Sequence, residues 1–231
     1  MKTTNFTTTR KSITMLLKKP SFVTENLSEL NSEFLDDIRN DEGAYCNKKI
    51  EKQDFNSVDF SKIDFSQIAI QHCSFKNCVF EKSSFMKAVF IDCFFNNCQM
   101  ENFYAQDLWI EECKFTGCTL IGSIFRNCVF KYSNLQYNNF NESKLESLFL
   151  DETFLISSEL SGCTIKSLKL NHSSLAESNF FKTPLKGIDF TNTNISGITL
   201  SQNFSELRGA TISPYQAGEL ISTLGIKVDY T

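Results

Sequence analysis

An apolar residue occupies every fifth position from Phe55 to Leu200, and this period constrains the fold more than any other feature of the sequence. The run holds 30 consecutive apolar positions, which a chain with 41% hydrophobic residues would produce by chance with a probability on the order of 10⁻¹². A period of five matches neither the 3.6 residues of an α-helical turn nor the alternation of a β-strand. It predicts a solenoid of short repeated units.

Each repeat of five has a second inward position, two residues before the central apolar residue. We call the central residue the centre and this second position the small slot, because small residues dominate it. Eight of the nine cysteines lie in the small slot and only Cys46 lies outside it. The eight are Cys73, Cys78, Cys93, Cys98, Cys113, Cys118, Cys128 and Cys163. We interpret them as small buried hydrophobes, each with a weak S–H donor.

A metal site is not expected from these cysteines. Zinc-binding cysteine pairs are normally spaced C-x₂₋₄-C and accompanied by matching histidines. In this chain the spacing between cysteines is set by the five-residue repeat. The only histidines, His72 and His172, are 100 residues apart. The sequence also has no Gly-rich phosphate loop, HExxH or nucleophile motif, so we expect no catalytic residue, metal or cofactor and no enzyme activity.

The residue two positions after each centre is predicted to turn a corner. Every glycine within the repeats lies there, where a positive φ costs glycine least. These glycines are Gly117, Gly122, Gly162, Gly187 and Gly197. The smallest centre, Ala105, has the largest small-slot residue, Phe103, which indicates that volume is conserved in a packed interior.

The two ends of the chain depart from the repeat. Residues 1–45 are predicted to form an N-terminal extension with a short helix around 12–19 and an amphipathic helix at about 25–40, whose apolar residues are Leu27, Leu30, Phe34, Leu35 and Ile38. The repeats are assigned to residues 46–204, and residues 205–231 to a C-terminal cap. Ser213 and Pro214 are typical of a helix N-terminus, Gly225 of a helix end, and residues 226–228 of a last strand.

Charge and hydropathy exclude several classes of partner. The net charge is −4 and the pI is about 5.3, which argues against direct binding of nucleic acid or of an anionic membrane. No apolar stretch approaches the ~18 residues that span a bilayer. A soluble cytoplasmic protein is therefore expected.

The repeats resemble the pentapeptide repeat, A(D/N)LXX. Residues 56–60 (NSVDF), 61–65 (SKIDF) and 191–195 (TNTNI) carry the resemblance. It implies an all-β fold, a right-handed quadrilateral β-helix in which residues 20 apart stack. The 30 repeats would make about 7.5 coils, or a rod roughly 36 Å long. Because no insertion breaks the frame, we expect no protruding loops.

Stacking by 20 residues separates faces of unlike charge. The acidic face has its centres at Ile70, Phe90, Ile110, Phe130, Leu150, Leu170 and Phe190, and it carries Asp92, Glu111, Glu112, Asp151, Glu152 and Asp189 against Lys131 and Lys169. The basic face has its centres at Phe65, Phe85, Ala105, Phe125, Leu145, Ile165 and Leu185. An apolar column on the acidic face, Val89, Trp109, Val129 and Phe149, marks a contact site. Either a partner or the N-terminal helix would cover it.

The C-terminal sequence resembles the tail of the Qnr-type and MfpA-type quinolone-resistance proteins. The resemblance rests on residues 205–210 (SELRGA), 213–217 (SPYQA) and 224–228 (LGIKV). It implies an end-to-end homodimer, here through Ala217, Leu220, Ile221, Leu224 and Ile226. It also implies a DNA-mimicking rod that binds DNA gyrase or topoisomerase IV, with contacts expected at the six acidic-face carboxylates and at Trp109 and Phe149.

An alternative function remains open from the sequence. The chain would then be a scaffold for another protein partner, with the N-terminal helix and the apolar column as its working parts. The N-terminal extension favours this alternative, because it is not part of the Qnr-type pattern.

Overall fold

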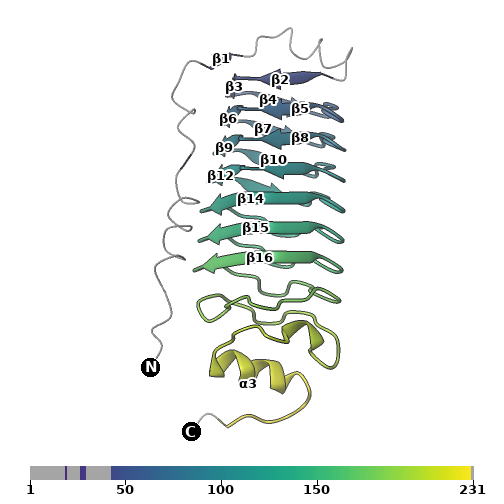
Figure 1. Cartoon of the computed structure of the whole chain (residues 1–231), viewed down its shortest axis with the longest axis vertical. Coiled ribbons are helices and arrows are strands. Elements are labelled where there is room, and N and C mark those ends of the chain that lie inside the picture. The colour runs from purple at the N-terminus through teal and green to yellow at the C-terminus, as the bar shows by residue number, and fades with distance from the viewer. Residues whose placement is uncertain (1–18, 20–26, 30–42, 230–231) are drawn as a thin grey trace, which may run out of the picture.

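The chain forms a rod of stacked coils, and the computed structural model describes residues 19, 27–29 and 43–229 (Figure 1). Its strands pair in parallel with a spacing of 20 residues, as in Ile50 with Ile70 and Phe55 with Phe75. Four repeats therefore make one coil. The expected parallel β-solenoid is confirmed, with about seven turns.

The strands line three of the four sides of the rod. The acidic face contains β3 (Lys48–Glu51), β6 (Ala69–Gln71), β9 (Val89–Ile91) and β12 (Trp109–Glu111). The basic face contains β2 (Ala44–Cys46), β5 (Asp64–Ser66), β8 (Ser84–Met86) and β11 (Tyr104–Gln106). A third face contains β4 (Asp54–Asn56), β7 (Ser74–Lys76), β10 (Phe94–Asn96) and β13 (Lys114–Thr116). On the fourth face, isolated bridges from Asp59 to Thr199 hold the coils together.

Three longer strands join the basic face to the acidic face across their shared corner. They are β14 (Ile124–Lys131), β15 (Lys144–Asp151) and β16 (Thr164–Asn171). The corner residues have positive φ, for example 58° at Lys82 and 66° at Gly117, as the glycine positions predict. The pairing of β15 with β16 shifts at one place, where Glu146 lies opposite Ser167.

Phenylalanine rings stack along the interior of the first coils. Phe75 lies 4.9 Å from Phe55 and 4.7 Å from Phe95, measured between ring centroids, and Phe95 lies 4.4 Å from Phe115. The volume exchange at Ala105 and Phe103 is confirmed, because both are fully buried. After Phe115 the same stack continues as Leu135, Leu155 and Leu175, all buried.

The small slot has a second property besides size. Its side chains donate hydrogen bonds to the carbonyl of the residue 23 positions earlier, one coil away. Cys163 donates to Phe140, Ser123 to Met100 at 2.9 Å, and Asn138 Nδ2 to Phe115 at 3.1 Å. Thiol, hydroxyl and amide groups replace each other here because each is a compact donor. All eight small-slot cysteines are buried and free.

Of the N-terminal extension, Ser28–Glu29 forms a strand, β1, that pairs in parallel with β3. These two residues lie within the helix predicted at about 25–40, and their extended pairing differs from it because β3 offers a free sheet edge. The other apolar residues of the predicted helix, Leu30, Phe34, Leu35 and Ile38, lie outside the described residues, as does the short helix expected before Lys19.

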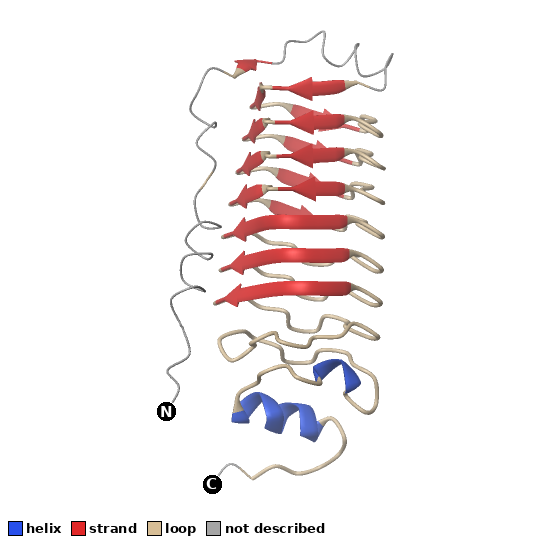
Figure 2. Ribbon diagram, in the orientation of Figure 1, coloured by secondary structure: helices blue, strands red, loops and turns tan. Residues whose placement is uncertain are grey.

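A helix closes the C-terminal end of the rod (Figure 2). The five-residue repeat ends at a 3-10 helix, Ser205–Leu207. The helix α3 follows at Pro214–Ser222, with Ser213 as its N-cap. Gly225 has a φ of 78° just beyond the helix, as predicted for a helix end. Residues 226–228 form no strand, which contradicts the expectation of a last strand there.

The side chain of Gln216 continues the interior ladder at this end. It reaches back from α3 and donates to the carbonyls of Phe190 at 2.8 Å and Thr193 at 2.7 Å. Its oxygen accepts the backbone N–H of Ser213 in a capping box. The helix thus supplies the donor that a further coil would have provided.

Candidate functional site

The apolar column on the acidic face is buried in its first three members. Sheet pairing places Trp109 between Val89 and Val129, with Phe149 following on the next coil. The exposed fractions of Val89, Trp109 and Val129 are 0%, 5% and 3%, and Phe149 is half-buried. The column predicted as a contact site is therefore a small apolar cluster of its own, outside the interior of the rod.

Trp109 and Glu111 form a polar edge to this column. The indole Nε1 of Trp109 donates to Glu111 Oε2 at 3.1 Å, and Lys19 Nζ lies 2.6 Å from the same oxygen. Burial by itself raises the pKa of Glu111, but the hydrogen bonds from Lys19 and Trp109 outweigh it and hold the pKa below its ordinary value. Glu111 is consequently an anion already engaged by a cation of its own chain.

Asp151 is also neutralised within the chain. It is 7% exposed, Lys131 Nζ lies 3.0 Å from its carboxylate, and Asn171 Nδ2 donates to it at 2.6 Å. Lys131 Nζ also lies 5.9 Å from the centre of the Trp109 ring, within reach of a cation–π contact. Glu111 and Asp151, two of the predicted contact residues, thus hold the face together and offer little free charge.

The other four predicted carboxylates present their charge outward. Glu112, Glu152 and Asp189 are exposed, and Asp92 is half-buried with its carboxylate 3.0 Å from His72 Nδ1. Hydrogen bonds from the backbone and side chain of Thr191 lower the pKa of Asp189. These four carboxylates are the ones that a basic partner could reach.

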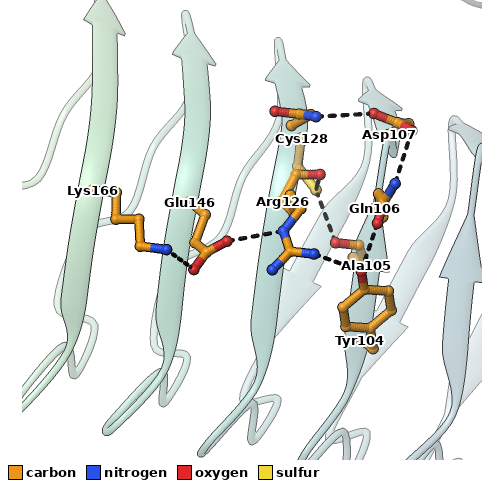
Figure 3. A network of polar contacts seen from close by, with 9 residues as sticks. Tyr104, Ala105, Gln106, Asp107, Arg126, Cys128, Glu146 and Lys166 are labelled. Atoms are coloured by element: carbon orange, nitrogen blue, oxygen red, sulfur yellow. Dashed lines mark hydrogen bonds and ion pairs between the residues drawn. The ribbon is translucent and has the colours of Figure 1, made fainter.

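The basic face pairs most of its central charges (Figure 3). Glu146 lies between residues one coil above and one below, with Arg126 Nε at 2.9 Å and Lys166 Nζ in direct contact. Hydrogen bonds from Lys166 and Arg126 lower the pKa of Glu146. Arg126 also contacts Tyr104 Oη at 3.3 Å. This ladder pairs two cations with one carboxylate, so the middle of the face keeps a net positive charge.

The described residues contain no cluster of three or more potential metal ligands. Burial raises the pKa of the Cys128 thiol to about 12 and that of Cys163 to about 11, far from thiolate chemistry at neutral pH. In the part of the chain that the structure describes, no helix is long and apolar enough to cross a membrane.

The outer side of the C-terminal cap is a second apolar surface, and it is exposed. Tyr215, Ile221, Leu224 and Ile226 are 63%, 39%, 53% and 52% exposed. Leu220, in contrast, is 8% exposed and packs against the interior of the rod. Of the residues predicted for a dimer interface, Leu220 therefore serves the fold, because α3 turns it inward beside Gln216; Ala217 is half-buried.

The pentapeptide-repeat family models match two stretches of the chain, residues 63–102 and 108–180. No curated protein sequence matches the chain. Among solved structures, a trypsin-treated form of QnrB1, described as a plasmid-mediated fluoroquinolone resistance protein, is 27% identical with a TM-score of 0.54. The match covers 81% of this chain and 95% of that one.

HetL, a pentapeptide repeat protein involved in heterocyst differentiation in the cyanobacterium Nostoc, is 13% identical to this chain with a TM-score of 0.35. The match covers 78% of this chain and 89% of HetL. That likeness carries no functional argument. The repeat matches and the fold together show that the chain carries pentapeptide repeats and folds as a pentapeptide-repeat β-solenoid.

Proposed function

We propose that this protein binds a type II topoisomerase, DNA gyrase or topoisomerase IV, as a non-enzymatic mimic of DNA and thereby changes the action of fluoroquinolones. The observation that carries the proposal is the similarity to QnrB1, a fluoroquinolone resistance protein, over almost the whole length of that chain. The resemblance of the C-terminal tail to the Qnr and MfpA types supports it.

The acidic face supplies the charges that such a mimic needs. Glu112 and Glu152 occupy the same corner two coils apart, or about 10 Å along the rod, and both are exposed. Asp92 lies one coil before Glu112 in the same corner row, and Asp189 lies on the same face nearer the C-terminal end. A basic DNA-binding groove would attract this row at long range, and the attraction would weaken as salt rises.

The outer side of the cap supports a two-fold dimer, end to end. Ile221, Leu224 and Ile226 form an exposed apolar patch at the tip of the rod, and a patch of this kind buries itself against its own copy in an isologous interface. A dimeric rod would have a two-fold axis like that of the topoisomerase. We accordingly assign the dimer to Ile221, Leu224 and Ile226, with Ala217 at its edge.

Gyrase supercoiling with and without ciprofloxacin tests the proposal. We expect the full-length protein to protect or inhibit supercoiling at micromolar concentration, and the double variant Glu112→Lys/Glu152→Lys to require at least about 10-fold more protein. The matched control is Glu142→Lys/Glu177→Lys, which makes the same charge change at exposed corners away from the acidic face. No effect of the wild-type protein, or equal loss in both variants, would refute topoisomerase binding through this face.

The same assay together with a pull-down distinguishes topoisomerase binding from the alternative, a scaffold for a different protein. A partner captured by the full chain and lost when residues 1–44 are removed, together with unchanged supercoiling, would favour the scaffold.

A further inference from the structure

The burial of the apolar column is not a property of its position in the repeat. Val89, Trp109 and Val129 each directly precede a centre and point away from the interior. Phe94 and Phe154 occupy the same position on the third face, and they are 49% and 45% exposed. Trp109 is larger than either phenylalanine and is 5% exposed. Something outside the repeats therefore covers the column.

Lys19, Ser28 and Glu29 of the N-terminal extension lie against the acidic face. Lys19 contacts Glu111 at 2.6 Å, beside Trp109. Strand β1 pairs with β3 at the first coil of the same face, and Lys48 Nζ donates to Ser28 Oγ at 2.9 Å. The extension is thus attached to this face at two points.

The spacing of these two points gives the direction of the chain. Ser28 lies one coil before Lys48, and Glu111 lies three coils after it, so the two attachments are about four coils or ~20 Å apart. Lys19 and Ser28 are nine positions apart in the sequence, a separation that can extend to about 30 Å. The distance between the two attachments is therefore within reach of the linking segment, and Lys19 lies nearer the C-terminal end of the rod than Ser28 does.

The residues before Lys19 match the column in length and in chemistry. The column continues for two coils beyond Trp109, or ~10 Å, and 18 residues would extend about 27 Å even as a helix. Residues 1–19 contain Arg10, Lys11 and Lys18 and no acidic residue. Ile13, Leu16 and Leu17 have the i, i+3, i+4 spacing of one helix face.

We propose that residues 1–19 are an intramolecular ligand of the acidic face. Ile13, Leu16 and Leu17 cover Trp109, Val129 and Phe149, while Lys19 and the other cations neutralise Glu111 and its neighbours. The segment occupies part of the surface that a basic partner would contact and neutralises some of its charge, so the segment is autoinhibitory. The covering stands without the proposed function, whereas the autoinhibition rests on it.

Trp109 reports the covering directly, because it is the only tryptophan of the chain. In the full-length protein we expect a blue-shifted emission and weak quenching by acrylamide. The full-length variant Leu16→Gln/Leu17→Gln should shift the emission to the red and raise the quenching constant at least threefold. An excess of the synthetic peptide 1–19 should restore the protected emission, less effectively at high salt.

The control variant is Thr7→Gln/Thr8→Gln, which makes two substitutions in the same segment away from the apolar residues and should leave emission and quenching unchanged. Circular dichroism of all variants checks that the solenoid is intact. An intact Leu16→Gln/Leu17→Gln variant with wild-type quenching would overturn the covering. A second measurement on the wild type is carbodiimide cross-linking, which should join Lys19 to Glu111; its absence would also count against the proposal.

Supercoiling then tests the autoinhibition. Leu16→Gln/Leu17→Gln should act on gyrase at a concentration at least about fivefold lower than the wild type. If the emission shifts and the wild type acts on gyrase but the variant gains nothing, the autoinhibition is wrong and the covering stands. If the emission shifts and no form of the protein acts on gyrase, the proposed function is wrong and the intramolecular ligand remains.

Discussion

Two apolar surfaces lie outside the interior of this rod, and they differ in whether anything covers them. The apolar column around Trp109 is buried, and the cation Lys19 of the same chain lies at its edge. The outer side of the cap, with Ile221, Leu224 and Ile226, is exposed at the tip. The difference fits the two proposals made above, in which the column is covered by the chain itself and the tip binds a second copy.

The largest effect is expected at the tip. Ile221→Asp/Leu224→Asp should weaken the proposed dimer at least about 100-fold, because a charge in the centre of a small apolar interface removes its main anchors. Sedimentation velocity over a range of concentrations measures the change. Gln202→Asp/Asn203→Asp adds the same charge to exposed residues at the same end and should leave the dimer intact. If the wild-type chain is monomeric at 100 μM, the tip is not a dimer interface and the proposed difference between the two surfaces is wrong.

A substitution on the inner side of α3 should change the stability of the fold rather than the assembly of the proposed dimer. Gln216→Leu leaves the carbonyls of Phe190 and Thr193 buried without their donor and should lower the free energy of unfolding by about 3 kcal/mol. Urea unfolding followed by circular dichroism measures it. Gln99→Leu alters an exposed glutamine within the coils and should change stability by less than about 0.5 kcal/mol. Equal effects of the two variants would show that the cap does not extend the ladder.

A smaller effect, dependent on pH, is expected at Glu206, which ties the cap to the last coil. Burial raises the pKa of Glu206, but hydrogen bonds from Ser201 and from the backbone N–H of Lys182 outweigh it, so the pKa lies below the ordinary 4.5. Because the folded-state pKa is depressed, its stabilising contribution is complete above pH 4.5 and is lost as the pH falls through the folded value.

Glu206→Gln should therefore be less stable than the wild type at pH 7, and the gap should narrow toward pH 3. Urea midpoints of both proteins across this range measure the gap. A gap that is constant or widens on acidification would contradict the assigned direction of the pKa.

The smallest effect is expected for chemical modification of the rod interior. The buried thiols there should be inaccessible to reagents. Iodoacetamide at neutral pH should modify Cys46, which is exposed, and leave the eight buried thiols intact until the protein is denatured. Mass spectrometry of the native protein counts the adducts. Rapid modification of Cys163 would show that the C-terminal end opens readily.

The repeat in the sequence was sufficient to predict most of the fold. Centres, corners and the packing of Phe103 beside Ala105 follow from side-chain size at a fixed period, and size can be read locally. The cysteines were recognised as weak donors, but the hydrogen bonds that the small slot makes to the preceding coil were not predicted, although its occupants (Cys, Ser, Thr and Asn) all share a donor group. The predicted carboxylates were less informative, because ion pairing with Lys131 or Lys19 depends on which residues stack and on where the N-terminal extension lies.

The sequence by itself determined the solenoid, because a period of five repeated 30 times has few other ways to bury its apolar residues. It also determined the N-cap of α3, which needs only Ser213 and its near neighbours. The tertiary structure decided which outward apolar residues are covered. Lys19 and Glu111 are 92 residues apart, and Gln216 is 26 residues from the carbonyl it caps. Contacts over such separations depend on the whole coil geometry, which no local pattern specifies.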